Sequence, residues 1–83
     1  MIKAELIDIL DTAYDVEFSC HGKDYTALCW WEDGRSIFVA EQITEKNAQV
    51  FADGAACVDG YIIDGKTLGK WMDEDDFKLL DVY

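Results

Sequence analysis

Basic side chains are scarce in this sequence. Lysine and arginine together number 7 and histidine occurs once, against 18 aspartates and glutamates, so the formal net charge is −11 over 83 residues. A surface with this charge repels phosphates and anionic headgroups, and we therefore expect neither direct nucleic-acid binding nor membrane binding. The same charge favours a basic protein as the partner, with an association that weakens as salt is added.

Proline is absent, and the chain has no low-complexity tract and no internal repeat. Because nothing marks a linker, residues 1–83 are expected to form a single compact domain. No segment reaches the roughly 20 apolar residues that cross a bilayer. The apolar fraction of 51% nevertheless supplies a core, so the acidity is not that of a disordered tail.

Cysteine and histidine are too few and too poorly placed for most catalytic and metal sites. The three cysteines, an odd number with no signal peptide ahead of them, fit a reducing cytoplasm. His21 falls in an expected turn and Cys20 faces the sheet, so the two form no nucleophile–base pair. The aspartates between residues 59 and 75 do not follow the calcium-loop spacing. We therefore expect a non-enzymatic protein with no cofactor and no metal.

The hydrophobic pattern predicts an α+β fold. Residues 2–11 carry apolar side chains at helical spacing and predict an N-terminal helix. Residues 13–20, 25–31 and 36–41 predict a three-stranded antiparallel β-sheet. Two or three C-terminal helices are expected next: one from about Glu45 after the N-cap Thr44, one from Thr67, and a fresh turn capped by Asp73. Residues 61–63 fit a short extra strand.

Turn signals set the expected register of the sheet. A two-residue turn at Asp33-Gly34 pairs Cys29 with Phe38, and a turn centred on Gly22-Lys23 pairs Cys20 with Tyr25. The face expected to form the core carries Val16, Phe18, Cys20, Ala27, Cys29 and Phe38. The opposite face is expected to carry an apolar strip beside Asp15 and Glu17, made of Leu28, Trp30, Ile37 and Val39. Such a strip is either covered by C-terminal structure or is a contact surface.

Four consecutive acids are the most distinctive positive feature: Asp73, Glu74, Asp75 and Asp76, between Met72 and Phe77. Acids in the first turn of a helix face unpaired N–H groups, so the run fits a helix start. It also fits a surface that competes with nucleic acid for a basic groove, because B-DNA presents about one negative charge per 1.7 Å. Glu32, Asp33 and Glu41 around the second hairpin form a second acidic cluster.

Three segments of the sequence together form a recognisable pattern: Leu6-Ile7 before Tyr14-Asp15-Val16-Glu17-Phe18-Ser19, then Asp33-Gly34 before Ile37-Phe38-Val39, and the segment Trp71 to Phe77 with its acid run. In these segments the chain resembles the small acidic type II-A anti-CRISPR proteins of phages and prophages. The expected order of helix, three strands and helices is similar too. In that family, the hairpin acid and the acid run occupy the groove in which the CRISPR effector nuclease reads a short duplex motif. The resemblance implicates Asp33, Asp73 and Glu74.

Two functional hypotheses from different classes follow. The first is a non-enzymatic inhibitor from a phage or mobile element, which mimics DNA and blocks a CRISPR effector nuclease or another DNA-binding defence protein in the cytoplasm of the bacterial host. Its expected contact residues are Glu32, Asp33, Glu41, Asp73, Glu74, Asp75 and Asp76. The alternative is a protein–protein interaction domain of antitoxin or immunity type, which would use Leu28, Trp30, Ile37 and Val39. A third interpretation is an accessory domain with a merely solvated acidic surface.

Overall fold

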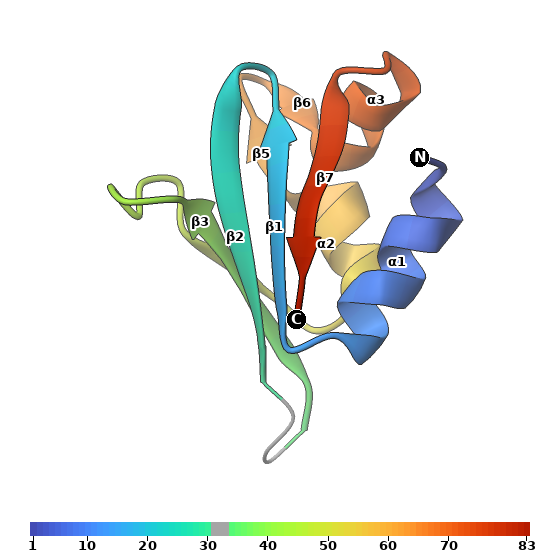
Figure 1. The fold of residues 1–83 in the computed structure, drawn as a ribbon, viewed down its shortest axis with the longest axis vertical. Coiled ribbons are helices and arrows are strands. Elements are labelled where there is room, and N and C mark those ends of the chain that lie inside the picture. Colours follow the sequence, from blue (N-terminus) through green and yellow to red (C-terminus); the bar gives the residue numbers. More distant parts are fainter. Residues whose placement is uncertain (31–33) are drawn as a thin grey trace.

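Three helices lie against one face of an antiparallel sheet in the described residues, 1–30 and 34–83, of a computed structural model (Figure 1). The first half of the chain forms α1 (Lys3–Thr12), β1 (Asp15–Cys20), β2 (Lys23–Trp30), β3 (Ser36–Glu41) and β4 (Gln49–Phe51). The second half forms α2 (Gly54–Gly60), β5 (Ile62–Ile63), β6 (Lys66–Thr67), α3 (Leu68–Asp73) and β7 (Phe77–Val82).

The main sheet has five strands in the order β4-β3-β2-β1-β7, and β5 and β6 form a separate two-stranded hairpin. The class is α+β, but the predicted three-stranded sheet is wrong, because short β4 extends one edge and the last strand, β7, extends the other. β7 pairs antiparallel with β1, which places the C-terminal segment beside the first strand of the chain. The short extra strand predicted near residues 61–63 is confirmed as β5.

The predicted helix from Glu45 is wrong. Ile43, Glu45 and Asn47 all have positive φ angles, between 54° and 70°, which a right-handed helix does not allow. The helix begins instead at Gly54, where the Asp53 carboxylate accepts a hydrogen bond from the Ala56 N–H at 2.8 Å. That contact satisfies one of the unpaired N–H groups of the first turn.

The start of α3 follows the prediction, and the segment after it does not. The Thr67 hydroxyl accepts a hydrogen bond from the Lys70 N–H at 3.2 Å, as expected of an N-cap. Asp73 was expected to cap a further helical turn, but it is the last residue of α3. Residues 77–82 are a strand, in which Phe77 packs against Phe18 with a ring separation of 5.4 Å.

The first hairpin turns at His21-Gly22 rather than at Gly22-Lys23. Both turn residues have positive φ, 48° and 83°, which is the geometry of a two-residue type I′ hairpin. Phe18 therefore pairs with Tyr25 and not with Ala27, a shift of two residues. Because side chains alternate with a period of two, this shift keeps Phe18 on the predicted core face.

The second hairpin differs by one residue, and this changes the composition of both faces. Cys29 pairs with Ile37, and Ala27 pairs with Val39. A shift of one residue turns every side chain of a strand to the opposite face. Ile37 and Val39 are therefore fully buried, whereas Phe38 lies on the other side. Trp30 pairs with Ser36, whereas the predicted turn pairs Trp31 with Ser36; Asp33 of that turn lies outside the described residues.

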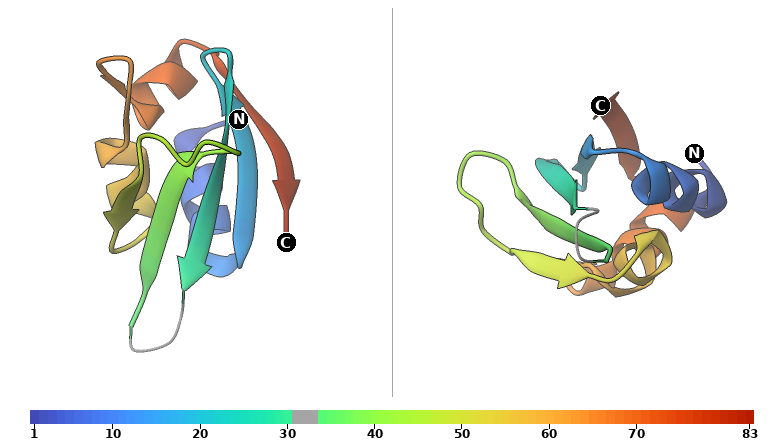
Figure 2. Two further views of the ribbon diagram at one scale, coloured as in Figure 1. Left: turned by 90° about the vertical axis from the view of Figure 1, so that its left-hand side faces the viewer. Right: turned by 90° about the horizontal axis from the view of Figure 1, so that it is seen from below.

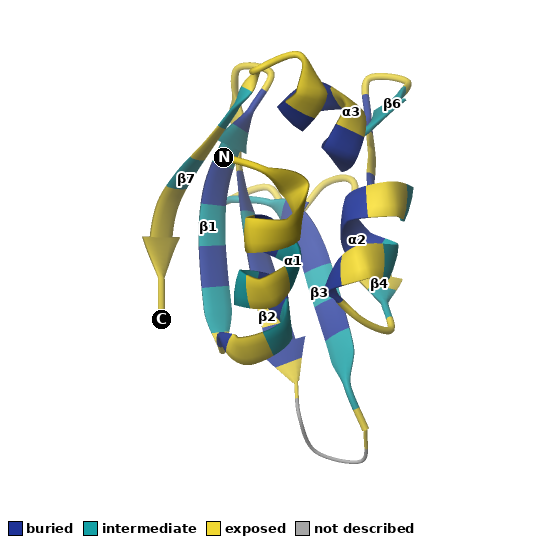
Figure 3. Cartoon of the chain, turned by 90° about the vertical axis from the view of Figure 1, so that its right-hand side faces the viewer, coloured by how far each residue is buried: buried dark blue, intermediate teal, exposed yellow. Residues whose placement is uncertain are grey.

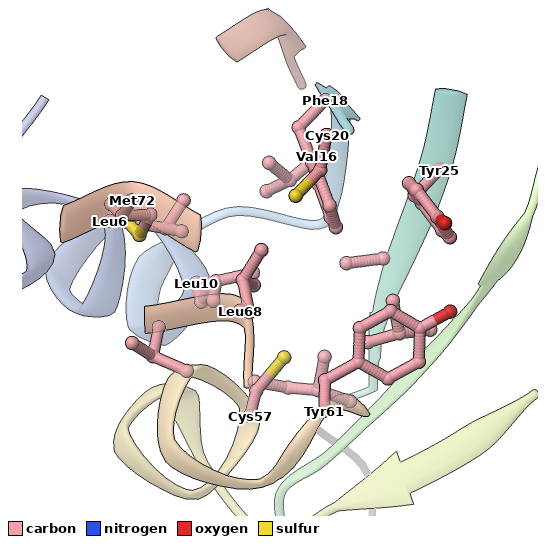
Figure 4. Close-up of a cluster of buried hydrophobic side chains, with 14 of the residues drawn as sticks. Leu6, Leu10, Val16, Phe18, Cys20, Tyr25, Cys57, Tyr61, Leu68 and Met72 are labelled. Carbon is pink, nitrogen blue, oxygen red and sulfur yellow. The ribbon is translucent and has the colours of Figure 1, made fainter. Parts of the chain in front are cut away.

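The core lies between the sheet and the helices. Figure 4 shows the helix side chains of Leu6, Leu10 and Leu68 facing the strand side chains of Val16 and Phe18. Buried polar atoms of the aromatic residues are satisfied: the Tyr61 hydroxyl donates to the Asn47 carbonyl at 2.9 Å, and the Trp71 Nε1 donates to the Ile63 carbonyl at 2.8 Å. Figure 3 shows the same division, with the helices buried along the side that faces the sheet.

Arg35 connects the second hairpin to the carboxyl end of α1 through hydrogen bonds. Its guanidinium donates to the carbonyls of Leu10 and Asp11, which have no partner within the helix. The Asp11 carboxylate in turn accepts the Gly54 N–H at 2.8 Å. A Cβ atom on Gly54 would lie 2.6 Å from the Ile7 carbonyl, so only glycine allows α2 to approach α1 this closely.

The register of β3 can be tested by two neighbouring substitutions. Ile37→Ala should lower the free energy of unfolding by about 2–5 kcal/mol, because it empties a fully buried site. Phe38→Ala, the matched control, should cost less because Phe38 is partly exposed on the opposite face. Urea unfolding followed by circular dichroism measures both. A larger loss for Phe38→Ala than for Ile37→Ala would contradict this register.

Candidate functional site

The acid run lies at the carboxyl end of α3 and does not start a helix. Its backbone N–H groups close the helix end: Glu74 donates to the Lys70 carbonyl at 3.1 Å, and Asp75 donates to the Met72 carbonyl at 3.0 Å. Asp75 has a φ of 60°, which lets the chain reverse into β7. Acids at this end face the negative pole of the helix dipole, which is unfavourable. Neighbouring cations compensate for this.

Three of the four carboxylates in the run contact a basic side chain. Asp73 pairs with Lys3 at 3.2 Å, and both oxygens of Glu74 contact Lys66, at 2.8 and 2.9 Å. Asp76 contacts His21 Nδ1 at 3.0 Å. Within the described part of the chain, Asp75 alone among the four has no such contact.

Trp71 joins these contacts into a structural unit. The His21 ring stacks on the Trp71 ring with centroids 4.0 Å apart, and the Lys66 ammonium lies 4.4 Å from the same ring. The first hairpin, β6 and α3 are thereby tied together. The run therefore serves the fold through Asp73, Glu74 and Asp76, a role that its sequence did not indicate.

Of the second predicted acidic cluster, the structure describes Glu41. Glu41 ends β3, where its largely buried side chain pairs with Lys23 at 3.6 Å. Glu32 and Asp33 lie outside the described residues. The described contacts thus place Glu41 in a pair of its own, not in the acid run.

None of the described helices covers the side of the main sheet that faces away from them (Figure 2). The loop after β3 lies beside part of this side, where Ala40 is only 4% exposed. Strand pairing arranges its side chains in rows across the strands: one row joins Val50, Phe38, Leu28 and Asp15, and the next joins Ala40, Thr26, Glu17 and Asp81. We call this surface the open sheet face. The first row is apolar over β4, β3 and β2 and acidic over β1, and the second is apolar or neutral over β3 and β2 and acidic over β1 and β7.

The acidic half of the open sheet face comprises Asp15, Glu17 and Asp81. Glu17 lies directly opposite Asp81 in the β1–β7 pairing. In the described residues, no lysine or arginine lies within salt-bridge distance of any of the three. One carboxylate oxygen of Asp15 is buried and has no hydrogen-bond partner there. Like charges directly opposite each other on neighbouring strands destabilise a sheet, so this arrangement costs the fold free energy.

The three carboxylates together affect the pKa of the neighbouring Tyr83 phenol. Its hydroxyl donates to Asp81 at 2.7 Å, and this hydrogen bond, followed by the charges of Asp81, Glu17 and Asp15, raises the pKa of the Tyr83 phenol. Glu17 also accepts a hydrogen bond from the Gln42 side chain at 3.2 Å. The acidic half is therefore a concentrated negative surface, and the hydrogen-bond donors that contact it among residues 1–30 and 34–83 are neutral.

The apolar half of the open sheet face comprises Leu28, Trp30, Phe38 and Val50. Val50 is 64% exposed and Trp30 is 59% exposed. Beside them, a cavity of about 170 Å³ opens between the strands and the loop after β3. Its lining is Thr26, Leu28, Phe38, Ala40, Glu41, Gln42, Ile43 and Glu45.

The predicted apolar strip is therefore divided between two faces. Leu28 and Trp30 lie on the exposed side as expected, but Ile37 and Val39 are core residues. Phe38 and Val50 take their places, and the correct register would have identified Phe38. Asp81 is not among the predicted contact residues, because the sequence predicts a fresh helical turn after Asp73, although the alternation of Phe77, Lys78 and Leu79 is that of a strand.

The buried thiols of Cys20 and Cys57 are not activated as nucleophiles. Burial raises the pKa of the Cys57 thiol to about 12, and burial followed by the charge of Asp76 raises that of Cys20 to about 12. Both thiols are therefore protonated at neutral pH and are poor nucleophiles. The described residues contain no cluster of three or more histidines, cysteines or acids suited to a metal ion. They also contain no helix long and apolar enough to cross a membrane.

Comparisons with family models, with curated proteins and with solved structures found no match to this chain. The resemblance to anti-CRISPR proteins thus depends on the sequence segments quoted above. Its topological part is lost, since two strands extend the sheet and the chain ends in β7 rather than in a helix.

The two classes of carboxylate should respond to neutralisation with opposite signs. Glu17→Gln should raise the free energy of unfolding by about 0.2–1 kcal/mol, because it removes repulsion from Asp81. Glu74→Gln should lower it by a similar amount, about 0.2–1 kcal/mol, because it breaks the pair with Lys66. Urea midpoints at low salt measure both changes, and the difference should shrink in about 1 M NaCl. A Glu17→Gln variant less stable than the parent would contradict the proposed repulsion.

Proposed function

We propose that this protein is a non-enzymatic inhibitor that occupies the nucleic-acid-binding groove of a basic protein. The acidic half of the open sheet face would lie where phosphates otherwise bind. One observation carries the proposal: Glu17 and Asp81 face each other, at a cost to the fold, and among the described residues no lysine or arginine lies within salt-bridge distance of either. Carboxylates kept unpaired in this way are available to lysines and arginines of a partner.

The acid run takes a secondary part in this proposal. Asp73, Glu74 and Asp76 already contact Lys3, Lys66 and His21, so a partner would have to displace those contacts to bind them. Asp75 requires no such displacement. We therefore assign the main contact to the open sheet face and a supporting contact to Asp75.

The net charge indicates that the target is a protein with a basic groove, and the resemblance indicates which such protein it is. A net charge of −11 favours fast, salt-sensitive association with a basic groove. Among proteins with such grooves, the resemblance favours a type II-A CRISPR effector nuclease. This proposal places the protein in the cytoplasm of a bacterial host that carries the phage or mobile element.

The second candidate is an interaction domain of antitoxin or immunity type. The exposure of Leu28, Trp30 and Val50 beside the partly exposed Phe38, on a face that no described helix covers, favours it, because contiguous apolar patches mark protein contacts. An apolar interface would persist at high salt, whereas a contact between carboxylates and a basic groove would not.

A DNA-cleavage assay with a type II-A nuclease and its guide tests the first candidate. The protein should inhibit cleavage when added before the target DNA and not when added after it, and it should co-elute with the nuclease in size-exclusion chromatography. Glu17→Lys/Asp81→Lys should weaken inhibition at least about tenfold, because it places like charges against the groove. Asp73→Lys/Glu74→Lys should have a smaller effect.

Asp8→Lys/Asp59→Lys is the matched control. It changes the net charge by the same amount, from −11 to −7, but on the exposed surfaces of α1 and α2. Equal weakening by the control would leave only bulk charge as the cause and would remove the open sheet face from the proposal. An absence of inhibition and co-elution across a panel of such nucleases would reject the CRISPR target.

A further inference from the structure

The open sheet face is amphipathic across its strands. In the row Val50, Phe38, Leu28 and Asp15, three apolar side chains lead to one carboxylate. Strands lie about 4.8 Å apart, so this row spans roughly 14 Å. An α-helix with its side chains is about 10–12 Å wide. A single helix laid along the strands would therefore contact the apolar half and the acidic half together.

The loop after β3 presents an apolar side chain beside this surface. Ile43 is 100% exposed and has a φ of 70°, a conformation that a β-branched residue adopts only under strain. Such strain persists where the surroundings enforce it, and it concentrates at ligand-binding sites.

Hydrogen bonds at both ends hold this loop in place. The Gln42 N–H donates to the Asp24 carbonyl at 3.0 Å, and the Asn47 side chain donates to the Ile62 carbonyl at 2.8 Å. Ile43 is therefore held at the edge of the cavity that Leu28 and Phe38 line. The volume of about 170 Å³ is sufficient for one large apolar side chain, since a cavity of about 150 Å³ holds a benzene molecule.

The negative charge of the acidic half indicates which kind of partner binds this face. A second copy of the chain would bring another net charge of −11 against the acidic half, and a nucleic acid would be repelled in the same way. A positively charged helix with one apolar side meets both halves. Its apolar residues would lie over β3 and β4, and its lysines or arginines would reach Asp15, Glu17 and Asp81.

We infer that the open sheet face binds a basic amphipathic helix of the partner protein, with one large apolar side chain inserted in the cavity beside Ile43. This inference deepens the proposed function and rests only on its basic partner. It does not depend on that partner being a nuclease.

The test uses the whole protein and two synthetic peptides. One is a leucine–lysine helix of about five turns with leucines on one side. The other has the same composition in scrambled order. Fluorescence anisotropy should show roughly tenfold tighter binding of the amphipathic peptide, because only it presents an apolar stripe to the apolar half. Amide chemical-shift changes should concentrate on Leu28, Phe38 and Val50.

Variants locate the contact. Ile43→Ser/Val50→Ser should remove the preference for the amphipathic peptide, while Ile62→Ser, an exposed isoleucine on the β5–β6 hairpin, should retain it. Circular dichroism verifies that each variant folds, which is expected because all three side chains are exposed.

Three results would overturn the inference. Equal affinity for the two peptides would show attraction by charge alone, and an equal loss in Ile62→Ser would place the contact elsewhere. A dimer in light scattering that Ile43→Ser/Val50→Ser dissociates would assign the face to a second copy. Peptide binding as expected, without inhibition of any nuclease, would uphold the inference and reject only the CRISPR target.

Discussion

The pairing of β3 with β2 decides the character of both sides of the molecule. With Cys29 opposite Ile37, the side chains of Ile37 and Val39 enter the core and Phe38 joins the outer surface. A shift of this register by one residue would turn all three side chains to the opposite face. The helices pack against the side that receives Ile37 and Val39, and the opposite side is left open as a surface that is apolar at one edge and acidic at the other.

The excess of acids is divided by tertiary structure into two groups with different roles. In the acid run, Asp73 and Glu74 contact lysines, and the backbone N–H groups of Glu74 and Asp75 close the carboxyl end of α3. On β1 and β7, Glu17 and Asp81 repel each other. The first arrangement stabilises the fold and the second opposes it, so the second has the stronger claim to a function in binding. The densest acidic segment of a sequence is therefore not necessarily its most available acidic surface.

The proposed partner satisfies both halves of the open sheet face at once. Apolar contact with Leu28, Phe38 and Val50 would supply affinity, because removing apolar area from water is favourable and little affected by salt. Contact with Asp15, Glu17 and Asp81 would supply orientation and speed of association. The two functional hypotheses drawn from the sequence thus assign binding to the same surface. Either its apolar half or its acidic half can contribute most of the binding free energy.

The sequence by itself determined the elements whose signals are local. Periodicity predicted α1 and the strands up to Glu41, Thr67 marked the start of α3, and composition required a basic partner for any electrostatic association. Only the tertiary structure decided the register of β3, the addition of β4 and β7 to the sheet, and the neighbours of each carboxylate. Asp81 meets Glu17 because the last strand returns to the first, a contact between residues far apart in the chain. No local pattern encodes such a contact, since it depends on how the whole chain closes around its core.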